Sequence, residues 1–151
     1  MSEAVVTREH DYRMPYSVGV RVPAGKDLLF VAGTTALPLY HDHPHVLADL
    51  EFPREPAEQT REALAGIREV VEGAGGTIED IVRLDVFITD MAVQDQVARE
   101  LGRCFPGSCP PAMTLIAVRE LVVPGLFVEI NAVAALEARS IDEAIPCNSA
   151  S

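Results

Sequence analysis

The stretch PAEQTREALAGIREVVEGAGGTIEDIVRLDVFITD, residues 56–90, decides the fold. Its first half repeats apolar residues at intervals of three and four, the spacing of one helical face: Ala57, Ala63, Leu64, Ile67, Val70 and Val71. Pro56 suits the first turn of this helix, and the glycines that follow residue 72 end it. The second half alternates apolar and polar residues over 81–89, which predicts a strand with one buried face.

Short capping motifs mark the ends of this strand. Thr77 and Asp80 resemble a capping box with Asp in place of Glu, so we expect a single helical turn before the strand. Asp90 follows the strand and is a suitable N-cap for a second helix, at about residues 93–104. That helix carries one apolar stripe: Val93, Val97, Leu101 and Cys104.

Further strands are predicted on both sides of this central stretch. The apolar run 28–33, preceded by turn residues, reads as a buried strand, and the alternating segment 18–22 suggests a hairpin with it. Residues 113–119 and 126–135 predict two more strands. Four prolines fall within residues 38–56, so we expect a long irregular loop there.

The predicted order of elements is ββ–α–β–α–ββ. Right-handed crossovers would place both helices on the same face of one sheet, which gives a two-layer α+β domain. We expect one domain over residues 1–136 and a polar tail over 137–151. The other face of the sheet carries many apolar residues, so we expect the chain to self-associate.

Composition limits the possible partners. Of 151 residues, 23 are acidic and 12 are basic, and the net charge of −11 argues against nucleic acid as the main partner. The apolar runs are too short for a membrane helix, and the start MSEAVVTREHDYR has no apolar signal region. The odd number and scattered positions of the cysteines, Cys104, Cys109 and Cys147, argue against a disulfide framework. We therefore expect a cytoplasmic protein with reduced thiols and no membrane partner.

Several motifs in register resemble a known family. They are Pro15-Tyr16, Phe30-Val31-Ala32-Gly33, QTREALAGIREVVEGAGG, IEDIVRLDVFITDM, Pro111-Ala112-Met113-Thr114 and the final Phe127–Ala134 segment FVEINAVA. Together they cover about residues 15–136, and the chain is similar to the Rid/YjgF superfamily of enamine/imine deaminases, formerly called endoribonuclease L-PSP. The resemblance implies a chorismate-mutase-like fold with a mixed sheet, and a homotrimer with clefts between its subunits.

The resemblance also implies site residues, carried over one position at a time. The glutamate that handles a water or a proton matches Glu129, the N-terminal tyrosine matches Tyr16, and the glycine on the early strand matches Gly33. The serine before that glycine is Ala32 here. The arginine that holds the substrate carboxylate in the deaminating members matches Met113, which is the main departure from the family pattern.

This departure changes the expected ligand. A thioether cannot neutralise a carboxylate or donate a hydrogen bond to it, so a 2-imino acid should bind poorly in the usual pose. We expect apolar surroundings from Met113, Leu115 and Phe87, which favour a neutral or hydrophobic ligand. Thr114 and Gly33 complete the predicted substrate-binding set. Another arginine, such as Arg13, Arg119 or one from a neighbouring subunit, could replace the missing one.

We therefore predict an enzyme that binds a small molecule between subunits. Glu129 would act as general acid or base, and Tyr16 would orient a polar group of the ligand. Candidate reactions are imine or enamine hydrolysis, tautomerisation, or an elimination or cyclisation step in specialised metabolism. The alternative is a trimer that binds a small molecule or a protein without turnover. A ribonuclease is disfavoured by the negative charge.

The sequence also contains a group of histidines and three cysteines, residue types that bind metals or act as nucleophiles. His41, His43 and His45 alternate along the chain and are residue types that bind zinc, but a solvated loop is the favoured interpretation because Pro44 lies among them. The alternatives are adventitious capture of a metal ion and, if the loop folds over the mouth of the cleft, a histidine that acts as a base. The cysteines lack an evident neighbouring base and are expected to be inert. We predict no cofactor and no metal.

Overall fold

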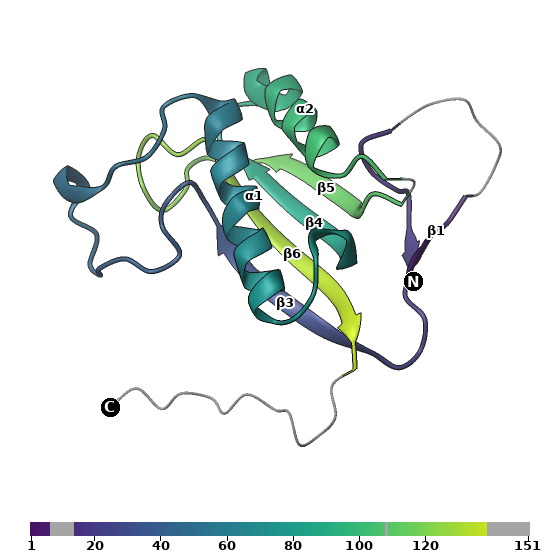
Figure 1. The fold of residues 1–151 in the computed structure, drawn as a ribbon. Helices are drawn as coiled ribbons and strands as arrows, with labels where there is room; N and C mark the ends of the chain where they lie inside the picture. The colour runs from purple at the N-terminus through teal and green to yellow at the C-terminus, as the bar shows by residue number, and fades with distance from the viewer. Residues whose placement is uncertain (7–13, 108, 139–151) are drawn as a thin grey trace, which may run out of the picture.

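The computed structural model describes residues 1–6, 14–107 and 109–138 (Figure 1). The strands are β1 (Glu3–Ala4), β2 (Val20–Arg21), β3 (Lys26–Thr34), β4 (Ile81–Ile88), β5 (Ala112–Ala117) and β6 (Val128–Glu137). The two α-helices are α1 (Pro56–Gly73) and α2 (Gln94–Cys104). Three short 3-10 turns are η1 (Leu47–Asp49), η2 (Ile78–Asp80) and η3 (Met91–Val93). The predicted tail began at residue 137, but Glu137 is the last residue of β6. Residues 139–151 of that tail, which include Cys147, and Arg13 fall outside the described residues.

The main sheet has four strands in the order β3-β6-β4-β5. Strand β6 is antiparallel to both of its neighbours, β3 and β4, whereas β4 and β5 are parallel and are connected through α2. Figure 1 shows α1 and α2 on the same face of this sheet, so the predicted two-layer α+β fold is confirmed. Among the described residues, no helix is both long enough and apolar enough to cross a bilayer.

The predicted hairpin between residues 18–22 and 28–33 is wrong. Strand β2 pairs instead with β1, with Arg21 opposite Glu3 and an ion pair of 3.5 Å between their side chains. Pro23 follows directly and has no N–H to donate, so a ladder that continued from β2 toward β3 would lack a hydrogen bond there. The long irregular segment predicted at 38–56 is confirmed, apart from the short turn η1.

The capping motifs form as the sequence predicts. Thr77 donates from its backbone N–H and from its hydroxyl to Asp80 Oδ2, at 2.8 and 3.0 Å, which starts the turn η2. Asp90 Oδ1 accepts a hydrogen bond of 2.8 Å from the N–H of Ala92 and caps η3, which leads into α2. These local bonds fix how the chain enters and leaves β4.

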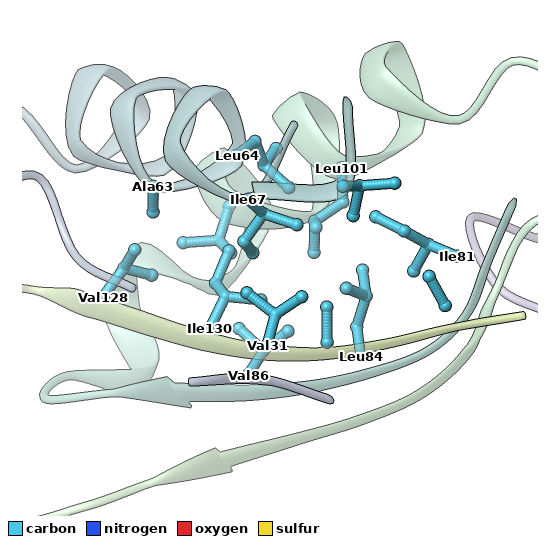
Figure 2. Close-up of a cluster of buried hydrophobic side chains, with 14 of the residues drawn as sticks. Val31, Ala63, Leu64, Ile67, Ile81, Leu84, Val86, Leu101, Val128 and Ile130 are labelled. Atoms are coloured by element: carbon cyan, nitrogen blue, oxygen red, sulfur yellow. The ribbon is translucent and has the colours of Figure 1, made fainter. Parts of the chain in front are cut away.

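The core fills the space between the helices and one face of the sheet (Figure 2). Ile67 from α1, Leu101 from α2, and Val86 and Ile130 from the sheet are all fully buried there. Complete burial of an aliphatic side chain of this size contributes about 1.5–3 kcal/mol. Burial of these side chains therefore makes the helix-covered layer a main source of the stability of the fold.

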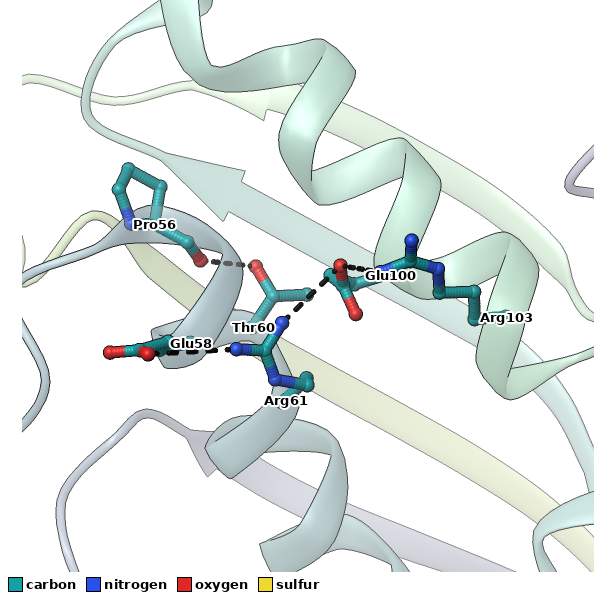
Figure 3. A network of polar contacts seen from close by, with 6 residues as sticks. All are labelled: Pro56, Glu58, Thr60, Arg61, Glu100 and Arg103. Carbon is teal, nitrogen blue, oxygen red and sulfur yellow. Dashed lines mark hydrogen bonds and ion pairs between the residues drawn. The ribbon is translucent and has the colours of Figure 1, made fainter.

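A buried carboxylate joins the two helices (Figure 3). Glu100 of α2 is 5% exposed and forms ion pairs with Arg103, at 2.6 Å, and with Arg61 of α1, at 3.4 Å. Both arginines keep half or more of their side chains in solvent, so the pair lies at the rim of the core. This contact links α2 to α1 at the edge of their apolar packing.

The other face of the sheet is open. Strand β3 turns Leu28 and Phe30 toward it, and these side chains are 54% and 74% exposed. Ile116 of β5 is 44% exposed. Exposed apolar groups gathered on one sheet face are typical of an interaction surface.

Candidate functional site

Glu129 lies on the open face of the sheet, near the start of β6. The strand alternates, so Val128 and Ile130 point into the core while Glu129 and Asn131 point to the open face. Phe87 of β4 is the direct cross-strand neighbour of Glu129. The carboxylate thus has an aromatic ring on one side and an amide two residues along its own strand.

A β-bulge in β3 brings Gly33 against this carboxylate. Val31 pairs with Ala132 and Thr34 pairs with Ile130, so β3 holds one extra residue between the two pairs. Val31 and Thr34 are both buried on the helix side, and Gly33 is turned toward the open face. A Cβ atom at position 33 would lie 2.9 Å from Glu129 Cδ and 3.1 Å from Asn131 Oδ1. Only glycine leaves room for the glutamate in this position.

Asn131 contributes an unused acceptor beside the glutamate. Its Oδ1 atom is buried and has no hydrogen-bond partner within the described part of the chain. A buried polar atom without a partner costs about 1–3 kcal/mol, so such an atom usually receives a bond from water or a ligand. We call Gly33, Phe87, Glu129 and Asn131 the glutamate site.

Gln59 holds the backbone just before Glu129. Its Nε2 donates to the carbonyls of Pro53 and Gly125, both at 2.9 Å, and its Oε1 accepts from the N–H of Phe127 at 2.6 Å. The side chain is completely buried. The sequence prediction missed this residue, although a glutamine four positions before Ala63 lies on the apolar face of α1 and was a detectable signal.

A separate pocket of about 210 Å³ lies at the start of β5. Its lining residues are Tyr16, Ser17, Val18, Arg83, Ala112, Met113 and Thr114. Ser17 joins the edge of the sheet here, donating from its N–H to the Pro111 carbonyl at 3.1 Å and from its hydroxyl to the Pro110 carbonyl at 2.6 Å. These bonds place Tyr16 beside Met113. We call this the tyrosine pocket.

The cation in the tyrosine pocket is already paired. Arg83 Nη2 lies 2.9 Å from Asp85 Oδ1, and Arg83 Nε donates to both carboxylate oxygens at 3.2 Å. The hydrogen bond to Asp85, together with its negative charge, raises the pKa of Arg83 above its usual value. The sequence prediction did not consider Arg83 as a cation near Met113, although both flank the predicted site. Of the alternatives it named, Arg119 lies beyond the end of β5.

The predicted site residues therefore divide into two groups within one chain. Gly33, Phe87 and Glu129 meet in the glutamate site, whereas Tyr16, Met113 and Thr114 line the tyrosine pocket. Met113 and Leu115 pair with Leu84 and Val86 and pack partly against the core, on the helix side of the sheet. The expected apolar grouping of Met113, Leu115 and Phe87 does not form in one chain, because Phe87 lies on the opposite face.

Cysteine and histidine side chains complete the candidate groups. Cys104 and Cys109 are free and partly buried. Burial raises the pKa of Cys104, and Arg68 offsets only part of this effect, so the thiolate is disfavoured. His41, His43 and His45 converge in the loop between β3 and α1, with one ring nitrogen of each within 4.8 Å of the others.

Comparison with known proteins gives a consistent result. The family model described as Endoribonuclease L-PSP matches residues 7–136. A crystal structure of the Rid family protein YyfB from Yersinia pestis is similar at 26% identity and a TM-score of 0.74, covering 89% of this chain and 98% of that one. Rv2704 from Mycobacterium tuberculosis, a member of the YjgF/YER057c/UK114 family, is 31% identical with a TM-score of 0.60, covering 80% of this chain and 86% of that one.

The YjgF gene product of E. coli is also similar, at 25% identity and a TM-score of 0.60, covering 80% of this chain and 87% of that one. The match to the family model spans most of the chain and includes the elements that carry Tyr16, Gly33, Met113 and Glu129. The resemblance noted from the sequence motifs is therefore confirmed. This chain belongs to the Rid/YjgF family, whose model carries the description Endoribonuclease L-PSP.

Proposed function

We propose that this protein is an enzyme of small-molecule metabolism in which Glu129 moves a proton on a neutral or hydrophobic substrate. The observation that carries the proposal is the contact between Glu129 and Gly33 on the open face. The bulge in β3 and the absence of a side chain at position 33 leave room for the carboxylate beside Phe87. A positioned carboxylate beside an aromatic surface is suited to general acid or base catalysis.

The preference for a neutral substrate rests on the charges around the tyrosine pocket. Met113 supplies no positive charge, and Arg83 is paired with Asp85 through two of its nitrogens. A substrate carboxylate bound there would meet a guanidinium whose positive charge is already paired with Asp85, so its attraction to Arg83 would be weakened. An imine, an enamine or another uncharged group does not depend on that attraction. Hydrolysis, tautomerisation or a related elimination or cyclisation is the reaction class we propose.

We further propose that a homotrimer assembles the complete cleft. Glu129 and Met113 lie on non-adjacent strands, with β4 between them, and on opposite faces of the sheet. The exposed Leu28, Phe30 and Ile116 give the open face an apolar surface for a second copy. Contact between copies would bring the glutamate site of one chain to the tyrosine pocket of another, as the family resemblance implies.

A coupled deamination assay tests the role of Glu129. Neutral imines and a panel of 2-imino acids are generated in situ, and the wild type is compared with Glu129→Gln and Gly33→Ala. We expect Glu129→Gln to lower the rate on the best substrate about 100-fold or more, the usual contribution of a general acid or base. Gly33→Ala should also lower the rate while the chain stays folded, because the alanine methyl group displaces a flexible carboxylate. Full activity of Glu129→Gln on every substrate would disprove the proposal.

Met113→Arg tests the substrate class. We expect this variant to gain activity on 2-imino acids relative to the wild type, since a cation is restored next to Tyr16. Ala117→Arg is the matched control, because it adds the same charge on the same strand outside the pocket. Wild-type activity on 2-imino acids that equals or exceeds activity on neutral imines would contradict the neutral-substrate proposal.

The second candidate function is ligand binding without turnover. The absence of a free cation from the residues described around the tyrosine pocket favours it, because the family arginine is replaced by Met113. Tight binding of a neutral imine analogue by a chain that shows no turnover would support this alternative. Turnover that depends on Glu129 would exclude it.

A further inference from the structure

We propose that His41, His43 and His45 form a binding site for a divalent transition-metal ion, with Zn²⁺ as the best match. The three ring nitrogens lie within 4.8 Å of one another. Nitrogens that share a tetrahedral zinc ion are about 3.3 Å apart, given zinc–nitrogen bonds of about 2.0–2.1 Å. Small rotations of the rings would bring the three histidines to that spacing. This site is separate from the glutamate site and the tyrosine pocket.

The orientation of His41 supports the proposal. Its Nδ1 lies 2.7 Å from the carbonyl oxygen of Pro38, which can only accept a hydrogen bond, so Nδ1 must carry the proton. The lone pair is then on Nε2, the atom that faces His45. Metal-binding histidines usually donate their second ring N–H to a carbonyl or a carboxylate in this way, which fixes the ring and raises its basicity.

The three imidazole rings also pack against one another. Their centroids are 4.8 Å apart for His41 and His43, 4.9 Å for His41 and His45, and 4.4 Å for His43 and His45. His41 Nε2 and His45 Nε2 are 2.8 Å apart, so one proton lies between them. For a metal ion to bind both Nε2 atoms, the proton of neutral His45 must be on Nδ1. Proton exchange with water converts His45 to this tautomer.

The loop that carries the histidines is anchored at its base. Ala36 and Leu37 are buried against Val123 and Leu126, and the N–H of Leu37 donates to Thr35 Oγ1 at 3.1 Å. The residues between this anchor and α1 are mostly exposed. A metal ion held by three side chains within five residues would order the exposed part of the loop. Three nitrogens leave a fourth position for water or another ligand.

Isothermal titration of the untagged, full-length protein with Zn²⁺, after treatment with a chelator, tests the proposal. We expect one Zn²⁺ per chain in the wild type. The variants His43→Ala and His45→Ala should each weaken binding by more than about 100-fold, since even a residue that only supports a ligand contributes about 10–100-fold. His43 is exposed and His45 is half-buried, and circular dichroism is used to confirm that the variants fold.

Two controls separate this site from other metal-binding groups. His10→Ala removes the remaining histidine of the chain and should leave binding unchanged. Replacement of Zn²⁺ by Co²⁺ should give the visible absorption of a nitrogen-ligated ion, without a sulfur-to-metal band from Cys104 or Cys109. Lack of Zn²⁺ binding by the wild type, or binding that is unchanged in His43→Ala and His45→Ala, would overturn the proposal. Because the site does not include Glu129, its failure leaves the proposed catalytic function untouched.

Discussion

The two faces of the sheet differ in what covers them. The face under α1 and α2 is filled by aliphatic side chains, and Val86, Val128 and Ile130 have no exposed surface. On the open face, the side chain of Phe30 is 74% exposed. The carboxylate of Glu129 lies against Gly33 on the same face. The same strands build both faces, because successive side chains of a strand point in opposite directions. One face therefore supplies stability and leaves the other available for binding and chemistry.

Removal of a core side chain should cause the largest loss of stability and is the first test of this difference between the faces. Ile67→Ala should reduce the free energy of unfolding by about 2–5 kcal/mol, since it removes buried methyl groups and leaves a cavity. Denaturant titration followed by circular dichroism measures the change. Leu28→Ala is the control on the open face, where the side chain is 54% exposed in the single chain. In a sample dilute enough to separate the copies, it should cost less than half as much. Equal losses in that sample would contradict the difference between the two faces.

A smaller loss of stability is expected when the hydrogen bonds of Gln59, which connect α1 to the segment before β6, are removed. Gln59→Leu leaves the carbonyls of Pro53 and Gly125 and the N–H of Phe127 without their partner. We expect a loss of about 1–3 kcal/mol in thermal or denaturant unfolding, the usual cost of buried groups left unpaired. Gln94→Leu, at an exposed position in α2, is the matched control and should change stability little. An unchanged midpoint for Gln59→Leu would show that this contact does not hold the strand.

The smallest effect on folding is expected on the open face. Phe30→Ser should change the free energy of unfolding of a dilute sample by less than about 0.5 kcal/mol, because the ring is largely exposed in the single chain. The same substitution should weaken the proposed association between copies. Sedimentation velocity is expected to show a lower mass for the variant than for the wild type at equal concentration. Equal masses would indicate that Phe30 lies outside the interface.

Local sequence patterns predicted most of the fold. Helix α1 extends over 56–73, against a prediction of 56–72, because its apolar residues repeat with helical spacing and Pro56 and the glycines mark its ends. Strand β4 was predicted by simple alternation, and the turn before it by Thr77 and Asp80. The hairpin with 18–22 was wrong because strand pairing is decided by distant segments, here residues 3–4, which no local pattern reveals.

The candidate site was predicted less completely for the same reason. Gly33 and Glu129 came from the family resemblance, and the bulge that joins them depends on register between segments about 100 residues apart. Arg83 and Asp85 alternate on one strand, so their ion pair could have been anticipated from spacing alone. The opposite orientation of Met113 and Phe87 could not have been anticipated in this way. The two residues lie on different strands, and the register between β4 and β5 decides which of their residues share a face of the sheet.

The position of β6 in the chain has a consequence for biosynthesis. This strand lies between β3 and β4 in the sheet but is translated after the other five strands of the described residues, and it pairs Lys26 with Glu137. Until β6 leaves the ribosome, β3 has no neighbour in the main sheet and exposes an unpaired edge. Contacts of such long sequence separation slow folding and leave apolar surface open in the nascent chain. The sheet therefore closes late in synthesis, and the nascent chain depends most on protection from aggregation just before its last strand emerges.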